Sequence, residues 1–246
     1  MMSKQKGKRM FLFSVTTLCA LATLATTAAN AVVLPAVKEY VELNHPIQEN
    51  METYPGLSEV ELYTKGGRNP SGSIIDGIKL LGISGTYIDA PFHMSDKGGK
   101  IADYPLSKLV NLPVIVVEKA AGRRAYEVAD FQGKEVNGKA VLLHTGQDRY
   151  FGKQAYSKNS PYVSTQAAEW LVRHGVVLVG IDAVLIDDYD HTETTPVHDI
   201  LLRNNIIIAE DMTNIGAVKG KDAYLTAVPP RMPMASFPAR IFATVY

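Results

Sequence analysis

The stretch Gly85-Thr86-Tyr87-Ile88-Asp89-Ala90-Pro91-Phe92-His93 holds a carboxylate and an imidazole four positions apart, beside a proline. Pro91 fixes its own backbone and disfavours helix at the residue before it, so the stretch is predicted to end a strand or to form a taut loop. In an extended chain alternate side chains share a face, which places Tyr87, Asp89 and His93 together. The stretch can therefore aim ligands at a metal ion. Taken alone, the stretch is better explained as a strand exit with a solvated aspartate and a satisfied histidine.

The first 31 residues have the pattern of a secretory signal peptide. An apolar stretch from 10 to 27 follows a basic segment without acids, and Ala29-Asn30-Ala31 is a small-residue cleavage site. We expect cleavage after Ala31 and an exported protein, either periplasmic or secreted. The alternative is an uncleaved membrane anchor, since the apolar stretch approaches the roughly 20 residues that span a bilayer. The basic residues are Lys4, Lys6, Lys8 and Arg9.

The composition excludes several classes of protein. The only cysteine, Cys19, lies in the expected leader, so residues 32–246 have no thiol for a nucleophile, a disulfide or a thiolate zinc site. Without the leader the chain carries 21 Lys and Arg against 25 Asp and Glu, a net charge of −4, and no basic run. We therefore expect neither nucleic acid nor, after leader cleavage, a membrane as a partner. Motifs of serine hydrolases and nucleotide enzymes are also absent from the sequence.

From residue 112 onward, short apolar segments alternate with helical ones. The β-branched runs at 112–117, 140–144 and 176–181 are too short for helices and too continuously apolar for a sheet with one wet face. They are predicted to be central strands. Ser164 as cap and Gly175 as stop predict a helix between them. Since no repeat or linker divides residues 32–246, we expect one mixed α/β domain.

A second set of candidate ligands lies nearer the carboxyl end. Thr195 and Pro196 are typical cap and first residues of a helix, which places His198 in its first turn, where the helix dipole favours a neutral ring. Glu210 follows a predicted buried strand at 206–208, at the kind of strand end where α/β sheets place ligand chemistry. Without further context His198 is more often a capping residue, and Glu210 more often a solvated acid.

An acidic stretch precedes this second helix. The stretch could bind a cation, but its spacing fits no calcium loop, so we expect a solvated loop that leads into the helix. The residues concerned are Asp182, Asp187, Asp188, Asp190, His191 and Glu193.

Together these segments resemble the cyclase family of metal-dependent hydrolases, which includes bacterial kynurenine formamidase and isatin hydrolase. The family signature H-x-G-T-H-x-D-x-P-x-H aligns with Ile83-Ser84-Gly85-Thr86-Tyr87-Ile88-Asp89-Ala90-Pro91-Phe92-His93. The resemblance implies a compact swivelling β/β/α-type domain, in which helices flank a curved β-layer, and assembly into a homodimer or tetramer. Further similar segments follow in the family's order at 43–47, 54–56, 145–148, 178–182, 196–202 and 210–214.

The resemblance also assigns roles to individual residues. Asp89, His198 and Glu210 match metal-binding positions of the family. His93 matches a histidine that the family is thought to use for proton transfer.

Two further metal-binding positions of the family differ in this chain. Two-zinc members use the first two histidines of the signature, which are replaced here by Ile83 and Tyr87. The resemblance therefore implies one divalent ion instead of two. Mixed oxygen and nitrogen ligands suit Zn²⁺ or Mn²⁺ and do not separate them.

These residues suggest hydrolysis. A divalent ion with an open position lowers the pKa of its water and polarises a carbonyl. His93 can take the water's proton and hand it to a leaving amine, and Tyr87 can donate to the developing oxyanion. We predict an arylformamidase-like hydrolase of a small amide, formamide or lactone-like ring. The alternative is a degenerate member of the family that binds a small ligand or a partner without turnover.

Overall fold

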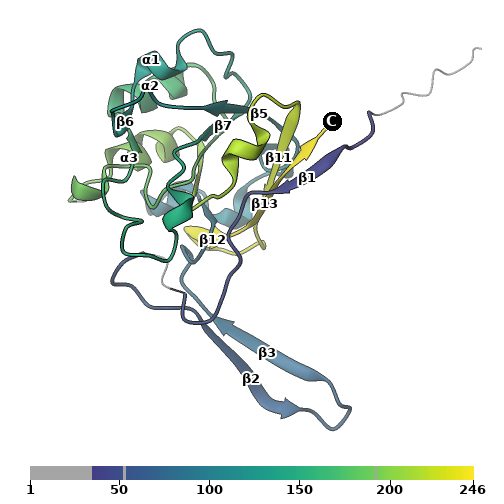
Figure 1. Ribbon diagram of the computed structural model, residues 1–246. Coiled ribbons are helices and arrows are strands. Elements are labelled where there is room, and N and C mark those ends of the chain that lie inside the picture. Colours follow the sequence, from purple (N-terminus) through teal and green to yellow (C-terminus); the bar gives the residue numbers. More distant parts are fainter. Residues whose placement is uncertain (1–34, 52–53, 192) are drawn as a thin grey trace, which may run out of the picture. The chain divides into compact units, whose positions relative to one another are not determined.

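The main sheet of the protein has nine strands in the order β1-β13-β11-β5-β7-β9-β10-β4-β12 (Figure 1). The computed structural model describes residues 35–51, 54–191 and 193–246. In sheet order, the strands are Glu39–Glu42, Arg240–Val245, Ala223–Val228, Leu112–Val117, Ala140–Leu143, Leu178–Ile181, Ile207–Glu210, Tyr87–Asp89 and Ser236–Pro238. The expected signal peptide and its cleavage site lie outside the described residues.

The remaining elements of the described residues are α-helices, two further strand pairs and 3-10 turns. The α-helices are α1 (Val128–Phe131), α2 (Thr165–Arg173) and α3 (Pro196–Arg203). Two further strand pairs are β2 (Glu61–Arg68) with β3 (Ile74–Lys79), and β6 (Ala125–Tyr126) with β8 (Tyr162–Val163). The 3-10 turns are Pro91–His93, Ile101–Asp103, Leu106–Lys108, Asp148–Tyr150, Tyr189–His191 and Ile215–Val218.

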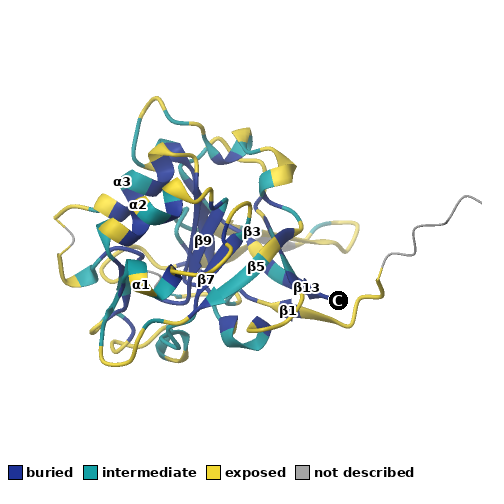
Figure 2. Cartoon of the chain, turned by 90° about the horizontal axis from the view of Figure 1, so that it is seen from above, coloured by how far each residue is buried: buried dark blue, intermediate teal, exposed yellow. Residues whose placement is uncertain are grey.

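Four neighbouring strands at the centre of the sheet, β5, β7, β9 and β10, are parallel. The β-branched runs predicted as central strands are confirmed, and the buried residues concentrate there (Figure 2). Each strand sends alternate side chains to two cores, as the period of two requires. Leu142 and Leu178 enter one core, whereas Val141 and Val179 enter the other, beside α2 and α3.

The helix predicted between Ser164 and Gly175 is confirmed as α2. Ser164 accepts a hydrogen bond from the backbone N–H of Ala167 at 3.2 Å, as an N-cap does. Gly175 has φ of +69°, the left-handed conformation that ends a helix. The mixed α/β fold with a strongly curled sheet is therefore as expected. No described helix has the length and apolar character needed to cross a bilayer.

The segment after Tyr87 forms the exit from a buried strand. β4 pairs with β10 on one side and with β12 on the other, so that Asp89 lies in the interior of the sheet. The 3-10 turn Pro91–His93 follows at once, and the backbone at Gly98 passes against it. A Cβ atom at Gly98 would lie 2.3 Å from the carbonyl carbon of Pro91. A close approach of backbone to backbone therefore sets the position of His93.

We predict that Gly98→Ala destabilises the protein by about 1–3 kcal/mol, because the new methyl group overpacks against backbone that cannot turn aside. Gly99→Ala is the matched control, since the nearest atom to a Cβ there is 3.8 Å away. Urea unfolding measures both variants. Equal urea midpoints for the two variants would contradict the close backbone approach at Gly98.

Candidate metal centre

Three residues from two distant segments of the chain converge at one end of β4. Asp89 ends that strand, His93 ends the following 3-10 turn, and His198 lies in the first turn of α3. One ligand atom from each residue lies within 4.8 Å of the other two. The rings of His93 and His198 have centroids 5.6 Å apart. The structure thus brings together the two halves of the predicted site.

The carboxylate of Asp89 is fully buried and is satisfied on one side only. Its Oδ1 accepts a hydrogen bond from the hydroxyl of Ser236. Its Oδ2 has no hydrogen-bond partner among the described residues and lies 3.7 Å from Nε2 of His198. A buried charged oxygen without a partner costs several kcal/mol, so this position favours a cation. The alternative of a strand exit with a solvated aspartate is therefore wrong.

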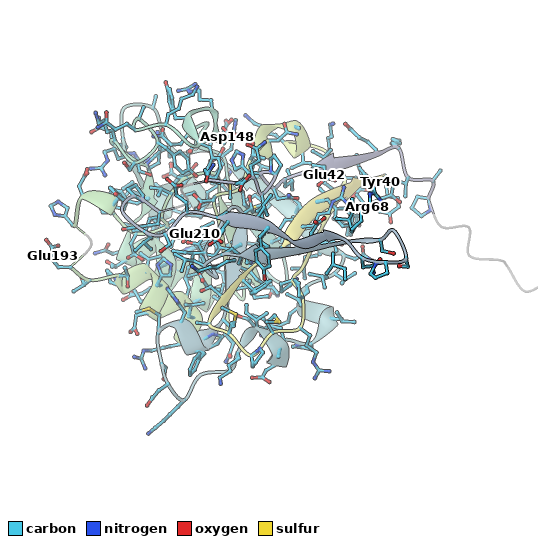
Figure 3. The ribbon with its side chains drawn as sticks, turned by 90° about the horizontal axis from the view of Figure 1, so that it is seen from below. Tyr40, Glu42, Arg68, Asp148, Glu193 and Glu210 are labelled. Carbon is cyan, nitrogen blue, oxygen red and sulfur yellow. The ribbon has the colours of Figure 1, made fainter. Side chains whose placement is uncertain are left out.

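Glu210 completes the cluster from the neighbouring strand. It is the last residue of β10 and is fully buried, and Figure 3 shows it inside the molecule. Its Oε1 accepts from the backbone N–H of Ile186 at 2.6 Å and lies 3.5 Å from Nε2 of His198. Oδ2 of Asp89 and Oε1 of Glu210 therefore both lie within 3.7 Å of the same nitrogen, Nε2 of His198.

His198 is buried among acids that determine its charge. Burial disfavours the charged ring, but Glu210, Asp187 and Asp89 outweigh it and raise the pKa of His198 well above its usual value. The expectation that the helix dipole keeps this ring neutral is therefore wrong for the metal-free protein. A cation at Nε2 would replace the proton that the acids otherwise attract, so these donors fit a divalent metal ion.

Asp187 orients His198 from the other side of the ring. Its Oδ2 lies 2.6 Å from Nδ1 of His198, while its two oxygens accept from the backbone N–H groups of Val197 and His198 at 2.7 and 3.1 Å. Asp187 thus caps α3 in place of Thr195, whose side chain makes no capping bond. A carboxylate on the far nitrogen of a ligating histidine is a common support of metal sites.

The solvated loop expected around Asp187 is only partly present. Asp182 and Asp187 are buried, and Asp182 accepts from the backbone N–H groups of Thr145 and Gly146 at 2.7 and 3.0 Å. Glu193 is exposed at the edge of the molecule in Figure 3. The expectation is therefore wrong for the two buried acids, which hold the backbone around the site.

Tyr87 stands where the family signature has a histidine, directly opposite Glu210 on the paired strand. Its hydroxyl donates to Oε2 of Glu210. Burial, followed by the charges of Glu210, Asp89 and Asp211, raises the pKa of Tyr87 well above its usual value, so the phenol is neutral. Tyr87 therefore lies against a candidate ligand, as its position in the strand predicts.

His93 differs from the other members of the cluster because it is exposed. Its Nδ1 lies 3.4 Å from Oγ of Ser236, the residue that also binds Asp89. The sequence does not point to Ser236 at all, and it places Asp187 in an expected solvated loop rather than in the site. Neither carries a local signal: Ser236 contacts the site across a strand pair, and Asp187 caps a helix that begins nine positions later.

Comparisons with known proteins point to one family. Its model, described as a putative cyclase, matches residues 41–188. A kynurenine formamidase of Bacillus cereus is 27% identical over 197 residues, which cover 78% of this chain and 90% of the relative. A kynurenine formamidase of Geobacillus thermodenitrificans is 26% identical over 192 residues, covering 77% and 89%. The match includes Asp89 and His93, and the fold supplies His198 and Glu210 beside them.

Solved structures share the fold. An isatin hydrolase bound to the product analogue thioisatinate superimposes with a TM-score of 0.74 at 21% identity, covering 84% of this chain and 92% of that one. A potential metal-dependent hydrolase with cyclase activity gives a TM-score of 0.71 at 23% identity, covering 85% and 98%.

We predict that Asp187→Asn weakens zinc binding by about tenfold or more, because the amide no longer supports the far nitrogen of His198 with a charge. Asp190→Asn is the control, since Asp190 is exposed and pairs with Arg124. Competition with a chromogenic chelator measures both affinities. Identical zinc affinity in the two variants would contradict a role for Asp187 in supporting the metal ligand His198.

Proposed function

Because the chain belongs to the cyclase family, we propose that it is a metal-dependent hydrolase of a small amide, formamide or lactone-like ring. The observation that carries this proposal is the Oδ2 of buried Asp89, which has no hydrogen-bond partner among the described residues and faces Nε2 of His198 beside Glu210. The names of the relatives support a C–N bond other than a peptide bond as the target. The proposed activity is therefore arylformamidase-like.

Asp89, His198 and Glu210 would hold the metal ion. When bound, a divalent ion lowers the pKa of a water molecule and polarises the substrate carbonyl. Two carboxylates and an imidazole suit Zn²⁺ or Mn²⁺. We propose one ion per chain, because Ile83 has no donor atom and the neutral phenol of Tyr87 is a poor ligand.

His93 is the proposed proton-transfer group. It is the exposed member of the cluster, at the end of a turn fixed by the hydrogen bond from its own N–H to the carbonyl of Ala90 at 2.8 Å. In this role the ring takes a proton from the attacking water and returns it to the nitrogen that leaves. A histidine suits both steps because one ring nitrogen can accept and release a proton while the other keeps its hydrogen.

Tyr87 is the proposed donor to the developing oxyanion. Its phenol has a single O–H, which Glu210 accepts in the metal-free protein. To act on the substrate, the phenol would have to turn this hydrogen from Oε2 of Glu210 toward the developing oxyanion. Tyr87 would then serve at the place where two-metal relatives have a histidine ligand.

A second candidate function is binding of a small ligand or a partner without turnover. The replacement of two signature histidines by Ile83 and Tyr87 favours it. The enzyme is the better-supported candidate because Asp89, His93, His198 and Glu210 are all kept and brought together.

We also propose that the protein is a homo-oligomer, either a dimer or a tetramer. The hairpin of β2 and β3 extends away from the main sheet in Figure 1 and carries exposed apolar side chains. A two-stranded hairpin is marginally stable alone in water, so a second copy that covers it would stabilise it. Light scattering of purified protein tests the assembly. The apolar residues are Leu62, Tyr63, Ile74, Ile75 and Ile78.

Export is proposed from the sequence of residues 1–31. A basic segment, an apolar stretch and the cleavage site at Ala29-Asn30-Ala31 support it. Amino-terminal sequencing of the protein recovered from an exporting host should begin at Val32. A chain that keeps its leader would contradict cleavage.

We predict that Asp89→Ala abolishes both metal binding and turnover, because it removes a buried ligand oxygen that accepts no hydrogen bond from the described residues. Asp96→Ala is the matched control, since Asp96 is exposed and seven residues farther along the same segment. Metal content by mass spectrometry and hydrolysis of N-formylkynurenine measure the two effects. Unchanged turnover in Asp89→Ala would refute the proposed mechanism, and a metal-bound but inactive wild type would favour the binding protein.

A further inference from the structure

Ser236 occupies the position directly opposite Asp89 in the sheet. It begins β12, which pairs with β4 in antiparallel register, and directly opposed residues present their side chains on the same face. The neighbouring backbone is tied at the same level, since the N–H of Ala90 donates to the carbonyl of Ala235 at 2.8 Å. Ser236 is 4% exposed. A buried hydroxyl is thus fixed between a candidate ligand and the solvent-facing histidine.

The hydrogen bonds of this hydroxyl have one consistent direction. A serine hydroxyl has one proton and can accept as well, whereas an ionised carboxylate only accepts. The proton of Ser236 therefore goes to Oδ1 of Asp89, with which it is in contact. A lone pair of the Ser236 Oγ then remains free to accept a hydrogen bond. Nδ1 of His93 lies 3.4 Å away and can donate this bond only if it carries a hydrogen.

This direction of the hydrogen bonds selects one neutral tautomer of His93. With hydrogen on Nδ1, the other nitrogen, Nε2, is the free base that accepts a proton. When Nε2 takes a proton from water, the ring becomes a cation whose Nδ1–H still points to Oγ of Ser236. Ser236 keeps its own proton on the bond to Asp89, so a single proton moves and no second transfer is needed.

The same hydroxyl gives the two oxygens of the Asp89 carboxylate different roles. Oδ1 is occupied by Ser236, while Oδ2 has no partner among the described residues and faces Nε2 of His198. The carboxylate is thereby held from rotating and offers one oxygen to a cation. Without the hydroxyl, Oδ1 would lose its hydrogen bond and the side chain would lose an anchor.

We propose that Ser236 is a positioning residue that sets both the Nδ1–H form of His93 and the single free oxygen of Asp89. The proposal rests on the hydrolase function proposed above, in which His93 transfers the proton and Asp89 binds the ion. Ser236 touches neither substrate nor ion in this role. It acts through the two residues that do.

The test compares Ser236→Ala with Ser236→Thr, which restores a hydroxyl, and with Ser160→Ala. Ser160 is an equally buried serine whose hydroxyl has only a long contact, 3.5 Å, to the carbonyl of Pro161. Nitrogen-15 NMR of the imidazoles, with His93 assigned by its loss in His93→Gln, reports which ring nitrogen carries hydrogen. Zinc affinity and separate kcat and KM values for N-formylkynurenine complete the set.

In wild type we expect His93 to show the Nδ1–H signature. Ser236→Ala should mix the two neutral forms, weaken zinc binding by about tenfold, and lower kcat by about 10–100-fold with KM within about twofold. Ser236→Thr should recover most of each property, and Ser160→Ala should match wild type. A merely structural serine would not change the ring's hydrogen position.

The Nε2–H signature in wild type overturns the proposal even where Ser236→Ala does not fold. So do unchanged NMR, zinc affinity and kcat in a folded Ser236→Ala. Failure of the proposed hydrolase function gives a different result, because wild type would then not hydrolyse the substrate. The NMR comparison would still show whether Ser236 sets which nitrogen of His93 carries hydrogen.

Discussion

The structure depends on burying several carboxylates around one imidazole. Asp89, Asp187 and Glu210 are almost wholly removed from water, and His198 is their shared partner. Charges of one sign in a dry interior repel one another and lose hydration, so such a cluster is unfavourable unless positive charge accompanies it. A proton on His198 supplies one unit, and a divalent ion supplies two. The arrangement of strands and loops at this end of the sheet is therefore suited to holding a cation.

In this fold each of the three candidate ligands is supported by a second side chain. β4 lies between β10 and β12, so that Tyr87 opposes Glu210 and Ser236 opposes Asp89. The remaining ligand, His198, comes from the first turn of α3, where Asp187 both caps the helix and binds the ring. Each candidate ligand thus has a backbone or side-chain support that fixes its direction, as metal sites generally require.

Much of the fold and part of the site could be predicted from the sequence because their signals are local. Runs of β-branched residues predict the central strands, and the cap at Ser164 and the stop at Gly175 predict α2. Asp187 and Ser236 could not be found in this way, since their contacts cross the chain between distant segments. The charge of His198 was wrongly predicted for a related reason: a helix end carries about half a charge, whereas full carboxylate charges approach the ring to 2.6–3.7 Å.

The most direct test of this account is a crystal structure of the protein grown with zinc, using anomalous scattering to locate the ion. We expect one peak per chain, bonded to Oδ2 of Asp89, Nε2 of His198 and a carboxylate oxygen of Glu210, with the Asp187 and Ser236 contacts retained. An empty cluster at saturating zinc, or an ion held elsewhere while these donors point apart, would contradict it.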